Sequence, residues 1–463
     1  MTSSYSSPFS WRYGSAAMRE LFSEETKRRM WRRLWVALAR SQMAAGIVSA
    51  DELRDLERNV DRVDLAAAQA IEEEIGHDLM AEVRVFASQA KAGGGKIHLG
   101  ATSMDVEDNV ETARIRTGLA MLQRATRDLL EVFAGRIEEF ADLTCMAYTH
   151  LQAAEPTTLG MRLSLWAQDI RFDHAELRRL AAWVPAKGMR GAVGTSASYH
   201  SLLDGTNLTP ATLESDVLGE FGLTAVAVSG QTYPRKLDYQ VIAALAGLAA
   251  SCSKFAFDVR ILASSPFGEV GEPFGKKQVG SSSMPFKRNP ILCERICSLA
   301  RLVASHAQVA WQNAAENLLE RTLDDSANRR TLLPEAFLAA DEIVRLAKRV
   351  VSGLRVDERR IAHNLAAFGP FSGTEAILMA AAKRGADRQA LHETLRNASM
   401  TAYDAIARGE ANPLQSLLSK DAQVCRYVKP EELGALMDPQ HHVGDAAERA
   451  RLFARSLHAL ERE

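Results

Sequence analysis

The chain has 463 residues, of which 47% are hydrophobic and 25% are charged. These proportions exclude a wholly disordered chain and a collagen-like repeat. Its 56 Lys and Arg residues stand against 58 Asp and Glu, and the net charge of −2 provides no overall attraction to nucleic acid or to a membrane surface. Because single hydrophobic cores stop growing at about 250–300 residues, we expect two or three domains.

The beginning of the chain and its cysteines indicate a cytoplasmic protein. The segment MTSSYSSPFSWRYGS lacks a basic stretch followed by an apolar one, so it does not resemble a secretory signal peptide. No uninterrupted apolar run approaches the roughly 20 residues that span a bilayer. The five cysteines include no CxxC pair, which suits a reducing compartment. We therefore expect a soluble cytoplasmic protein.

Helical periodicity dominates the middle of the chain. Apolar residues recur mostly in steps of three or four over 115–140 and again over 237–262, and a third such stretch begins after Pro290 and passes Trp311. The second stretch also carries many alanines opposite its apolar face, which predicts a helix enclosed on nearly all sides. Helices this long exceed the globular mean of about 11–12 residues and indicate an elongated bundle that subunits can share.

Strand signals are short and scattered, so we predict an all-α fold. A first helical domain is predicted over residues 1–104. A central domain of long helices is predicted over 105–355, and a shorter helical domain over 356–463.

The segment Gly280–Pro290 reads GSSSMPFKRNP and is unsuited to a packed core. Asn289 followed by Pro290 predicts the start of a helix whose positive end faces the loop. Lys287 and Arg288 add two cations to the same segment. The segment is therefore either an ordinary surface loop or a binding site for a carboxylate or another anion.

Three histidines lie in polar surroundings: His77, His98 and His150. Each can be an ordinary structural residue, yet three at the ends of separate helical segments can also converge as acid or base near neutral pH. Their spacing matches no metal-binding motif, so we expect no metal site.

The segment ERTLDDSANRR, residues 320–330, is rich in charge and contains one large aliphatic residue. It is either a solvated helix face or a set of arginines that binds phosphate. Arg12 and Tyr13 near the N-terminus carry no signal by themselves.

Together these segments resemble one known family. GSSSMPFKRNP resembles the GSSxMPxKxNP signature of the fumarase/aspartase superfamily, whose members eliminate fumarate from a succinyl substrate. More narrowly, six further segments resemble the adenylosuccinate lyase family in that family's order, and the last is decisive because other superfamily members lack it. These segments are SSPFSWRYGS, HDLMAEV, IHLGATSMDVEDN, THLQAAEPTTLG, SGQTYPRKLDYQ and ERTLDDSANRR.

The resemblance implies a three-domain fumarase/aspartase-like fold and a homotetramer with a central twenty-helix bundle. Each site would be built from three subunits. The implied substrates are adenylosuccinate, which yields AMP and fumarate, and the succinylaminoimidazole carboxamide ribonucleotide of purine synthesis, which yields the free carboxamide and fumarate. The resemblance implies no cofactor and no metal, and we expect neither a nucleic acid nor a membrane partner.

The resemblance also implies residue roles. Ser281 would be the general base and His150 the general acid, with Glu294 holding His150 charged and His77 assisting. The groups resembling those that bind the succinyl carboxylates are Thr102, Ser103, Thr149, Gln231, Lys287 and Asn289. The groups resembling those at the nucleotide phosphate and ribose are Arg12, Tyr13, His98, Arg295, Arg321, Ser326 and Arg330.

Two alternatives stand beside this interpretation. One is a related lyase that acts on another succinyl adduct, such as argininosuccinate, although such a substrate without phosphate would have no use for Arg12 and Arg321. The other is a non-catalytic structural protein, since the superfamily includes lens crystallins. Retention of Ser281, His150 and Lys287 argues against that second alternative.

Overall fold

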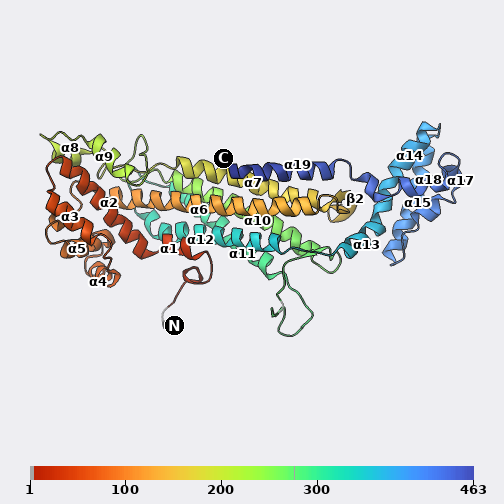
Figure 1. Ribbon diagram of the computed structural model, residues 1–463, viewed down its shortest axis with the longest axis horizontal. Helices are drawn as coiled ribbons and strands as arrows, with labels where there is room; N and C mark the ends of the chain where they lie inside the picture. The colour runs from red at the N-terminus through yellow and green to blue at the C-terminus, as the bar shows by residue number, and fades with distance from the viewer. Residues whose placement is uncertain (1–4, 276, 463) are drawn as a thin grey trace. The chain divides into compact units, whose positions relative to one another are not determined.

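The computed structural model describes residues 5–275 and 277–462 and is mostly helical, as predicted. Five long helices are labelled in Figure 1: α6 (Ser103–Glu139), α7 (Leu159–Trp183), α10 (Lys236–Leu262), α11 (Ile291–Ala315) and α12 (Asp324–Ser352). The three long helices that the apolar periodicity predicts are α6, α10 and α11, and the structure confirms all three.

Shorter elements precede, connect and follow the long helices. Before α6 come η1 (Pro8–Ser10), α1 (Ala16–Leu21), α2 (Glu24–Ala44), α3 (Ala50–Asn59), α4 (Leu65–Ile75), α5 (Asp78–Gln89) and η2 (Gly94–Lys96). Between α7 and α10 lie α8 (Ala197–Leu203) and α9 (Pro210–Gly219). After α12 come α13 (Glu358–Phe368), η3 (Gly369–Ser372), α14 (Gly373–Lys383), α15 (Arg388–Ala407), α16 (Leu414–Leu418), α17 (Ala422–Cys425), α18 (Pro430–Leu436), η4 (Pro439–His442), α19 (Ala446–His458) and η5 (Ala459–Arg462).

Two antiparallel pairs of strands complete the described part of the chain. They are β1 (Thr144–Thr149) with β2 (Gln152–Thr158), and β3 (Val270–Gly271) with β4 (Arg355–Val356). The first pair forms the connection between α6 and α7, whereas β3 lies between α10 and α11 and β4 directly follows α12.

The chain forms two compact units, and each long helix contributes one part to each unit because the divisions fall within the helices. The first unit comprises Met1–Ala125, Asp173–Ala250 and Ser298–Val344, and the second comprises Thr126–Phe172, Ser251–Cys297 and Arg345–Glu463. The three-domain division at residues 104 and 355 stays a prediction.

The core of the first unit is built around α2. Ser23 caps this helix by accepting a hydrogen bond from the Thr26 amide, and Glu24 and Glu25 in its first turn complement the helix dipole. Trp31 and Trp35, one turn apart, are buried on its inner face. The Trp35 ring stacks on Phe86 of α5 at 6.4 Å between centroids, which fixes α2 against α5.

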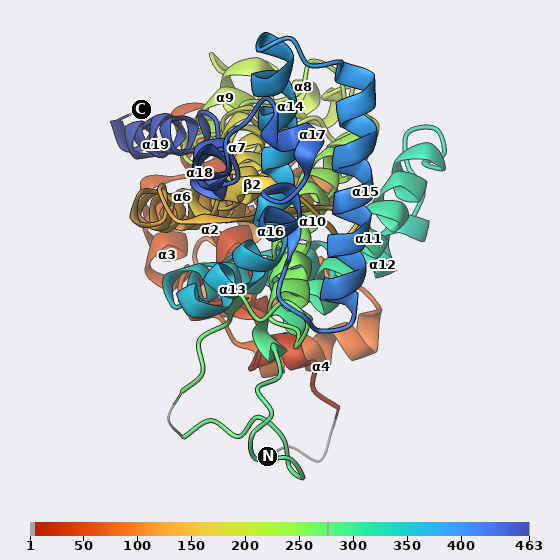
Figure 2. The ribbon, with the colours of Figure 1, turned by 90° about the vertical axis from the view of Figure 1, so that its right-hand side faces the viewer.

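In the second unit the long helices pack through aromatic side chains. Phe255 of α10 meets Phe133 of α6 at 5.5 Å and Trp166 of α7 at 5.3 Å between ring centroids. The Trp166 indole N–H donates to Asp258 at 2.7 Å, so the buried ring keeps a hydrogen-bond partner. The C-terminal helices α14 to α18 of the same unit are labelled in Figure 2. These helices share a separate cluster of buried apolar residues.

Two stretches, Lys236–Leu262 and Glu358–Lys383, have the length and hydropathy of a membrane span. Within α10, Val241, Leu245 and Cys252 are fully buried against the rest of the protein. A core helix has the same composition, so this buried face accounts for the hydropathy of α10. The alanine face of α10 is only partly covered, and Ala250 is exposed. Enclosure of α10 on nearly all sides is therefore wrong for the single chain.

Gly160, the second residue of α7, allows α7 to begin directly against the end of α6. A Cβ at this position would lie 2.6 Å from the Cα of Ala141 and 2.8 Å from the Ile137 carbonyl oxygen. We expect Gly160→Ala to lower the free energy of unfolding by about 1–3 kcal/mol, because neither backbone can yield without repacking. Thermal unfolding measures this change.

Gly135→Ala is the matched control, since nothing lies within 4 Å of a Cβ at Gly135 inside α6. Alanine favours a helix over glycine by about 1 kcal/mol, so this control should be neutral or stabilising. Equal melting temperatures for the two variants would contradict the close contact at Gly160.

Candidate functional site

His150 lies at the tip of the β1–β2 hairpin. Thr149 pairs with Gln152, so His150 and Leu151 form a two-residue turn, with φ values of 53° and 60°. Such turns usually take Asn-Gly, because residues with a Cβ seldom adopt positive φ. Both side chains are exposed at the tip. Backbone strain held at an exposed histidine is typical of a functional position.

Ser281 is held by the backbone of its own loop. Its Oγ accepts hydrogen bonds from the Met284 amide at 3.1 Å and the Ser283 amide at 3.4 Å. The Asn289 side chain donates to the Gly280 carbonyl oxygen at 3.0 Å and closes the base of the loop. Two amides directed at one hydroxyl oxygen would stabilise negative charge on it.

The positive end of α11, which follows this loop, is occupied by the protein itself. The buried Glu272 carboxylate accepts from the Leu292 amide at 3.0 Å and the Cys293 amide at 3.0 Å. A carboxylate of the chain itself therefore occupies this helix end, and binding of a ligand anion by the segment Gly280–Pro290 stays a prediction. The cap differs from the expected one, because the Asn289 side chain bonds the loop and the helix begins at Ile291.

The cations of the loop face a cavity of about 1090 Å³ in the second unit. Lys287, Arg288 and Asn289 line it, together with Arg260 and Arg355. Lys287 is exposed, so its ammonium group is accessible to an anion. On α11, Glu294 is exposed and Arg295 is half-buried. Within the described residues, no hydrogen bond joins His150 to Ser281 or to Glu294.

In the first unit, His77 and Ser103 meet at two helix beginnings. His77 is the N-cap of α5, and its Nδ1 accepts from the Met80 amide at 3.5 Å. The Ser103 hydroxyl lies 3.4 Å from its Nε2, within hydrogen-bond reach. Thr102 precedes Ser103 at the start of α6. Sequence reasoning placed these three residues in one site, and the structure brings them together.

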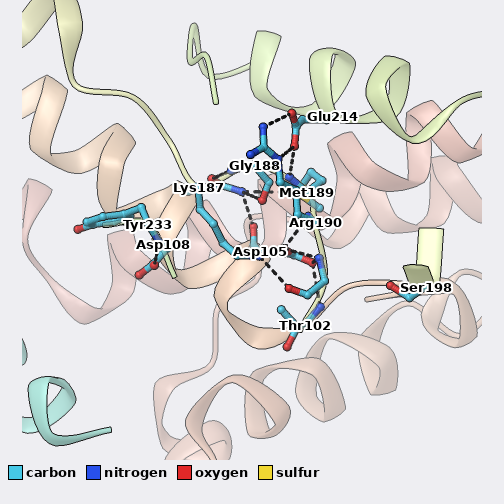
Figure 3. Close-up of polar contacts among 12 residues, drawn as sticks. Thr102, Asp105, Asp108, Lys187, Gly188, Met189, Arg190, Ser198, Glu214 and Tyr233 are labelled. Carbon is cyan, nitrogen blue, oxygen red and sulfur yellow. Dashed lines mark hydrogen bonds and ion pairs between the residues drawn. The ribbon is translucent and has the colours of Figure 1, made fainter. Parts of the chain in front are cut away.

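One buried carboxylate fixes the beginning of α6 (Figure 3). Asp105 is fully buried and accepts from the Thr102 amide at 3.0 Å, the Tyr199 hydroxyl at 3.2 Å and the ammonium of fully buried Lys187. It also accepts from the amides of Arg190 at 3.0 Å and of Gly191. Asp105 thereby ties the start of α6 to the loop that precedes α8.

That loop needs glycine where it crosses the segment before α10. Gly194 has φ of 82°, and a Cβ there would overlap the Ser229 carbonyl oxygen. Two residues after Ser229, the Gln231 amide donates to the Glu320 carbonyl oxygen at 3.0 Å. The segments that contain Thr102, Gln231 and Arg321 are thus linked step by step.

His98 is a neutral imidazole in this arrangement. The Trp35 indole N–H donates to its Nδ1 at 3.1 Å, which places the ring proton on Nε2. Burial lowers the pKa of His98 below its usual value, and the charge of Asp105 only partly opposes this. His98 also has φ of 68°, a conformation that side chains with a Cβ seldom adopt.

The segment 320–330 is part of a buried charge network. Arg329 donates to Asp238 at 2.7 Å, and fully buried Arg235 contacts Asp108 at 3.1 Å and also pairs with Asp325. A wholly solvated helix face is therefore the wrong interpretation of this segment, since Asp325 is buried and paired with arginines, although Glu320, Asp324 and Arg330 are exposed.

The arginines predicted to bind phosphate are also paired with carboxylates. Arg321 donates to Asp325 at 2.8 Å, and Arg330 donates to Asp78 at 2.8 Å. Ser326 lies on α12 between them and is half-buried. A ligand phosphate would therefore meet guanidinium groups that are already held in place.

Arg12 and Tyr13 lie in a turn anchored on α12. Both backbone amides donate to the Pro8 carbonyl oxygen, at 2.8 and 3.2 Å, and the Arg12 guanidinium lies over the Tyr13 ring at 5.8 Å from its centroid. The Ser15 amide donates to Asp341 at 2.5 Å, which holds the turn on the helix.

Sequence reasoning missed the groups that hold the candidate residues in place. Lys187, Arg235, Asp105 and Asp108 were not predicted. The last three lie inside segments that resemble the family. The available signal was therefore a charged residue in such a segment to which no role had been assigned. The immediate neighbours of Lys187 are Ala186 and Gly188, and no local pattern marks it. Within the described residues, no group of three or more His, Cys, Asp or Glu side chains is placed to hold a metal ion.

Comparison with known proteins identifies the family. A family described as "Lyase" matches residues 14–305, and one described as "Adenylosuccinate lyase C-terminus" matches residues 370–452. The chain belongs to the adenylosuccinate lyase family. It is 38% identical to adenylosuccinate lyase of Saccharomyces cerevisiae, covering 97% of this chain and 94% of the relative, and 34% identical to that of Archaeoglobus fulgidus, covering 97% and 98%.

Solved structures of other enzymes show the same fold. A fumarate lyase from Mesorhizobium sp. BNC1 matches with a TM-score of 0.83 at 24% identity, over 98% of this chain and 99% of that one. The 3-carboxy-cis,cis-muconate lactonizing enzyme from Pseudomonas putida matches with a TM-score of 0.84 at 25% identity, over 97% and 99%. The predicted fumarase/aspartase-like fold is therefore confirmed.

We expect Lys187→Met to lower the free energy of unfolding by about 3–5 kcal/mol, because it leaves the Asp105 carboxylate buried without its cation. Chemical denaturation of the purified protein measures this loss. The matched control is Lys254→Met on α10, whose ammonium pairs with Asp258 at 3.2 Å and is 53% exposed. An exposed pair contributes little, so the control should unfold almost as the native protein does. Similar losses in both variants would contradict the special role of the buried pair.

Proposed function

We propose that this lyase eliminates fumarate from adenylosuccinate, giving AMP, and from the succinylaminoimidazole carboxamide ribonucleotide, giving the free carboxamide. The observation that carries the proposal is the near full-length similarity to adenylosuccinate lyases. The chain also contains the residues to which the proposal assigns the reaction. These residues are Ser281, His150 and Lys287 for the chemistry, and Arg12, Arg321 and Arg330 for the nucleotide.

Ser281 is the proposed general base that removes a proton from the succinyl β-carbon. A serine hydroxyl is a weak acid, so the alkoxide needs stabilisation. The amides of Ser283 and Met284, which already donate to Oγ, supply part of it, and Lys287 supplies a positive charge in the same loop. The carbanion delocalises into the neighbouring carboxylate, which Lys287 and Asn289 would bind with Thr102, Ser103, Thr149 and Gln231.

His150 is the proposed general acid that protonates the departing nitrogen. Its place at a strained, exposed hairpin tip supports this role, because an exposed imidazole can reach a substrate and exchange its proton near neutral pH. Glu294 is proposed to hold His150 charged. His77, hydrogen-bonded to Ser103 at the start of α6, is proposed to assist proton transfer or orient the substrate.

The nucleotide end is proposed to lie at Arg12, Tyr13, His98, Arg295, Arg321, Ser326 and Arg330. Guanidinium groups bind phosphate bidentately, and the pairs Arg321–Asp325 and Arg330–Asp78 orient two of them in advance. The buried network around Arg235 holds the segment that carries these residues, so the ligand does not bear the cost of ordering it.

We further propose a cytoplasmic homotetramer in which three subunits contribute to each site. Large apolar side chains are exposed on the long helices, including Leu165 and Phe172 of α7, which lie two turns apart on one face, and Trp311 of α11. Exposed apolar residues of this size favour a protein interface. The partly uncovered alanine face of α10 allows another helix to approach closely. Shared sites would also bring His150 together with groups that a single chain does not bond to it.

Incubation of the purified protein with adenylosuccinate tests the proposed reaction. We expect fumarate and AMP in equal amounts, followed spectrophotometrically and confirmed by product analysis. Turnover of argininosuccinate without turnover of adenylosuccinate would favour the alternative of a related lyase. A folded tetramer inactive with every succinyl adduct would favour a structural protein.

Ser281→Ala should abolish turnover while substrate binding and assembly persist, because the hydroxyl bonds only its own loop. Turnover is measured with adenylosuccinate, and binding by calorimetry on the inactive variant. Ser283→Ala is the matched control, since its side chain is exposed in the same loop and has no proposed role in proton transfer. Near-native turnover in Ser281→Ala would disprove the assignment of the base.

A further inference from the structure

A small cavity of about 120 Å³ in the first unit adjoins the proposed nucleotide end. Ser326 and Arg330 of α12 line it, together with Asp78 of α5 and Glu107 of α6. Its volume is well below the 300–1,000 Å³ typical of a whole-ligand site, so it suits one end group of a ligand. Because Ser326 and Arg330 are proposed phosphate and ribose ligands, that group would be the phosphate.

Nearly all charged groups around this cavity are already paired. On α2 and α6, Lys27 contacts Glu24 at 2.7 Å and Arg114 contacts Glu111 at 2.8 Å. The positive charges of Lys27 and Arg114 are therefore neutralised by neighbouring glutamates.

The groups from α5, α12 and the deeper wall are paired as well. Arg330 contacts Asp78 at 2.8 Å, and Arg329 contacts Asp238 at 2.7 Å. Asp108 is bound to Arg235 at 3.1 Å. Among the described residues, Glu107 is the one cavity carboxyl with neither an ion-pair nor a hydrogen-bond partner.

A carboxyl in this position keeps its proton at neutral pH. Burial raises the pKa of Glu107 to about 8, with further contributions from the charges of Asp78 and Asp108, while Arg330 and Lys27 oppose the rise. The protonated group presents an O–H donor to the cavity, whereas the other carboxyls there are acceptors.

We propose that Glu107 is a specificity-determining residue for the nucleotide, its protonated carboxyl donating a hydrogen bond to a phosphate oxygen held by Ser326 and Arg330. The inference rests on the proposed function, because it assumes a phosphorylated ligand at this end. A hydrogen bond from a neutral carboxyl to a phosphate oxygen is of the strong, charge-assisted kind. An ionised carboxylate at the same position would instead repel the phosphate.

The pH dependence follows from the charges. A phosphate monoester has its second pKa near 6 and is a dianion above pH 7. Loss of the Glu107 proton above pH 8 therefore adds a negative charge beside a ligand whose own charge no longer changes. Affinity for the nucleotide falls as pH rises through the pKa of Glu107. If only the protonated form binds, the fall between pH 7 and pH 9 is roughly tenfold.

Calorimetric titration of the assembled, full-length protein with AMP tests the inference. We expect the native protein to lose about tenfold in affinity from pH 7 to pH 9. Glu107→Gln, which cannot ionise, should keep one affinity across this range. Glu111→Gln is the matched control: its carboxylate lines the same cavity one turn along α6 but is paired with Arg114, so the native fall in affinity should remain.

A second measurement needs no variant. At pH 8.5 the native protein should take up roughly half a proton or more when it binds AMP. The uptake is measured as the dependence of the binding heat on the ionisation enthalpy of the buffer. An equal fall in affinity in Glu107→Gln, or no proton uptake by the native protein, would overturn the inference alone. Failure of the native protein to bind AMP at pH 7 would overturn it together with the proposed function, and the assay with adenylosuccinate separates the two cases.

Discussion

Burial of charge organises the first unit, because a carboxylate removed from water must find its partners inside the protein. Asp105 is the extreme case: it is fully buried and accepts hydrogen bonds from five donor groups, of which four belong to residues more than 80 positions away in the chain. A shift of the α6 terminus or of the loop after Lys187 would leave one of these groups unpaired. The candidate site residues Thr102 and Ser103 lie three and two positions before Asp105, so the same contacts fix the backbone that carries them.

The network around Arg235 also satisfies buried carboxylates inside the protein, in this case through ion pairs. Three carboxylates, of Asp108, Asp238 and Asp325, face three guanidinium groups, of Arg235, Arg321 and Arg329, so the buried set is neutral as a group. Because the charges of this set cancel, the set can be buried. Once buried, each ion pair is stabilising only if its geometry is good. The proposed phosphate ligands Arg321 and Arg330 are attached to this framework. A nucleotide would therefore meet groups that are already oriented. In the described part of the chain, Glu107 is the one carboxyl of this cavity without an ion-pair or hydrogen-bond partner.

The sequence allows the long helices and the serine loop to be predicted, since both depend on local patterns. Apolar residues in steps of three and four mark α6, α10 and α11 without knowledge of their partners. Lys187 and Arg235 could not be interpreted in this way, because a single charge looks like a surface residue until its carboxylate is known. Those carboxylates are 82 and 127 positions away. The predicted cap of α11 was wrong for a related reason. The carboxylate that accepts from the Leu292 amide belongs to Glu272, twenty residues earlier, and the adjacent Asn289 does not supply the cap.

Glu272 also decides how the serine loop can act. Its carboxylate occupies the amides of Leu292 and Cys293, so the first turn of α11 is not available to bind a substrate anion or to stabilise the Ser281 oxygen. In the proposed mechanism that task falls to groups of the loop itself, which are the amides of Ser283 and Met284 and the ammonium of Lys287. Because two of these are backbone groups, their alignment depends on the loop conformation that the bond from Asn289 to Gly280 closes. Stabilisation of the proposed base is therefore a property of the folded loop and not of the helix end behind it.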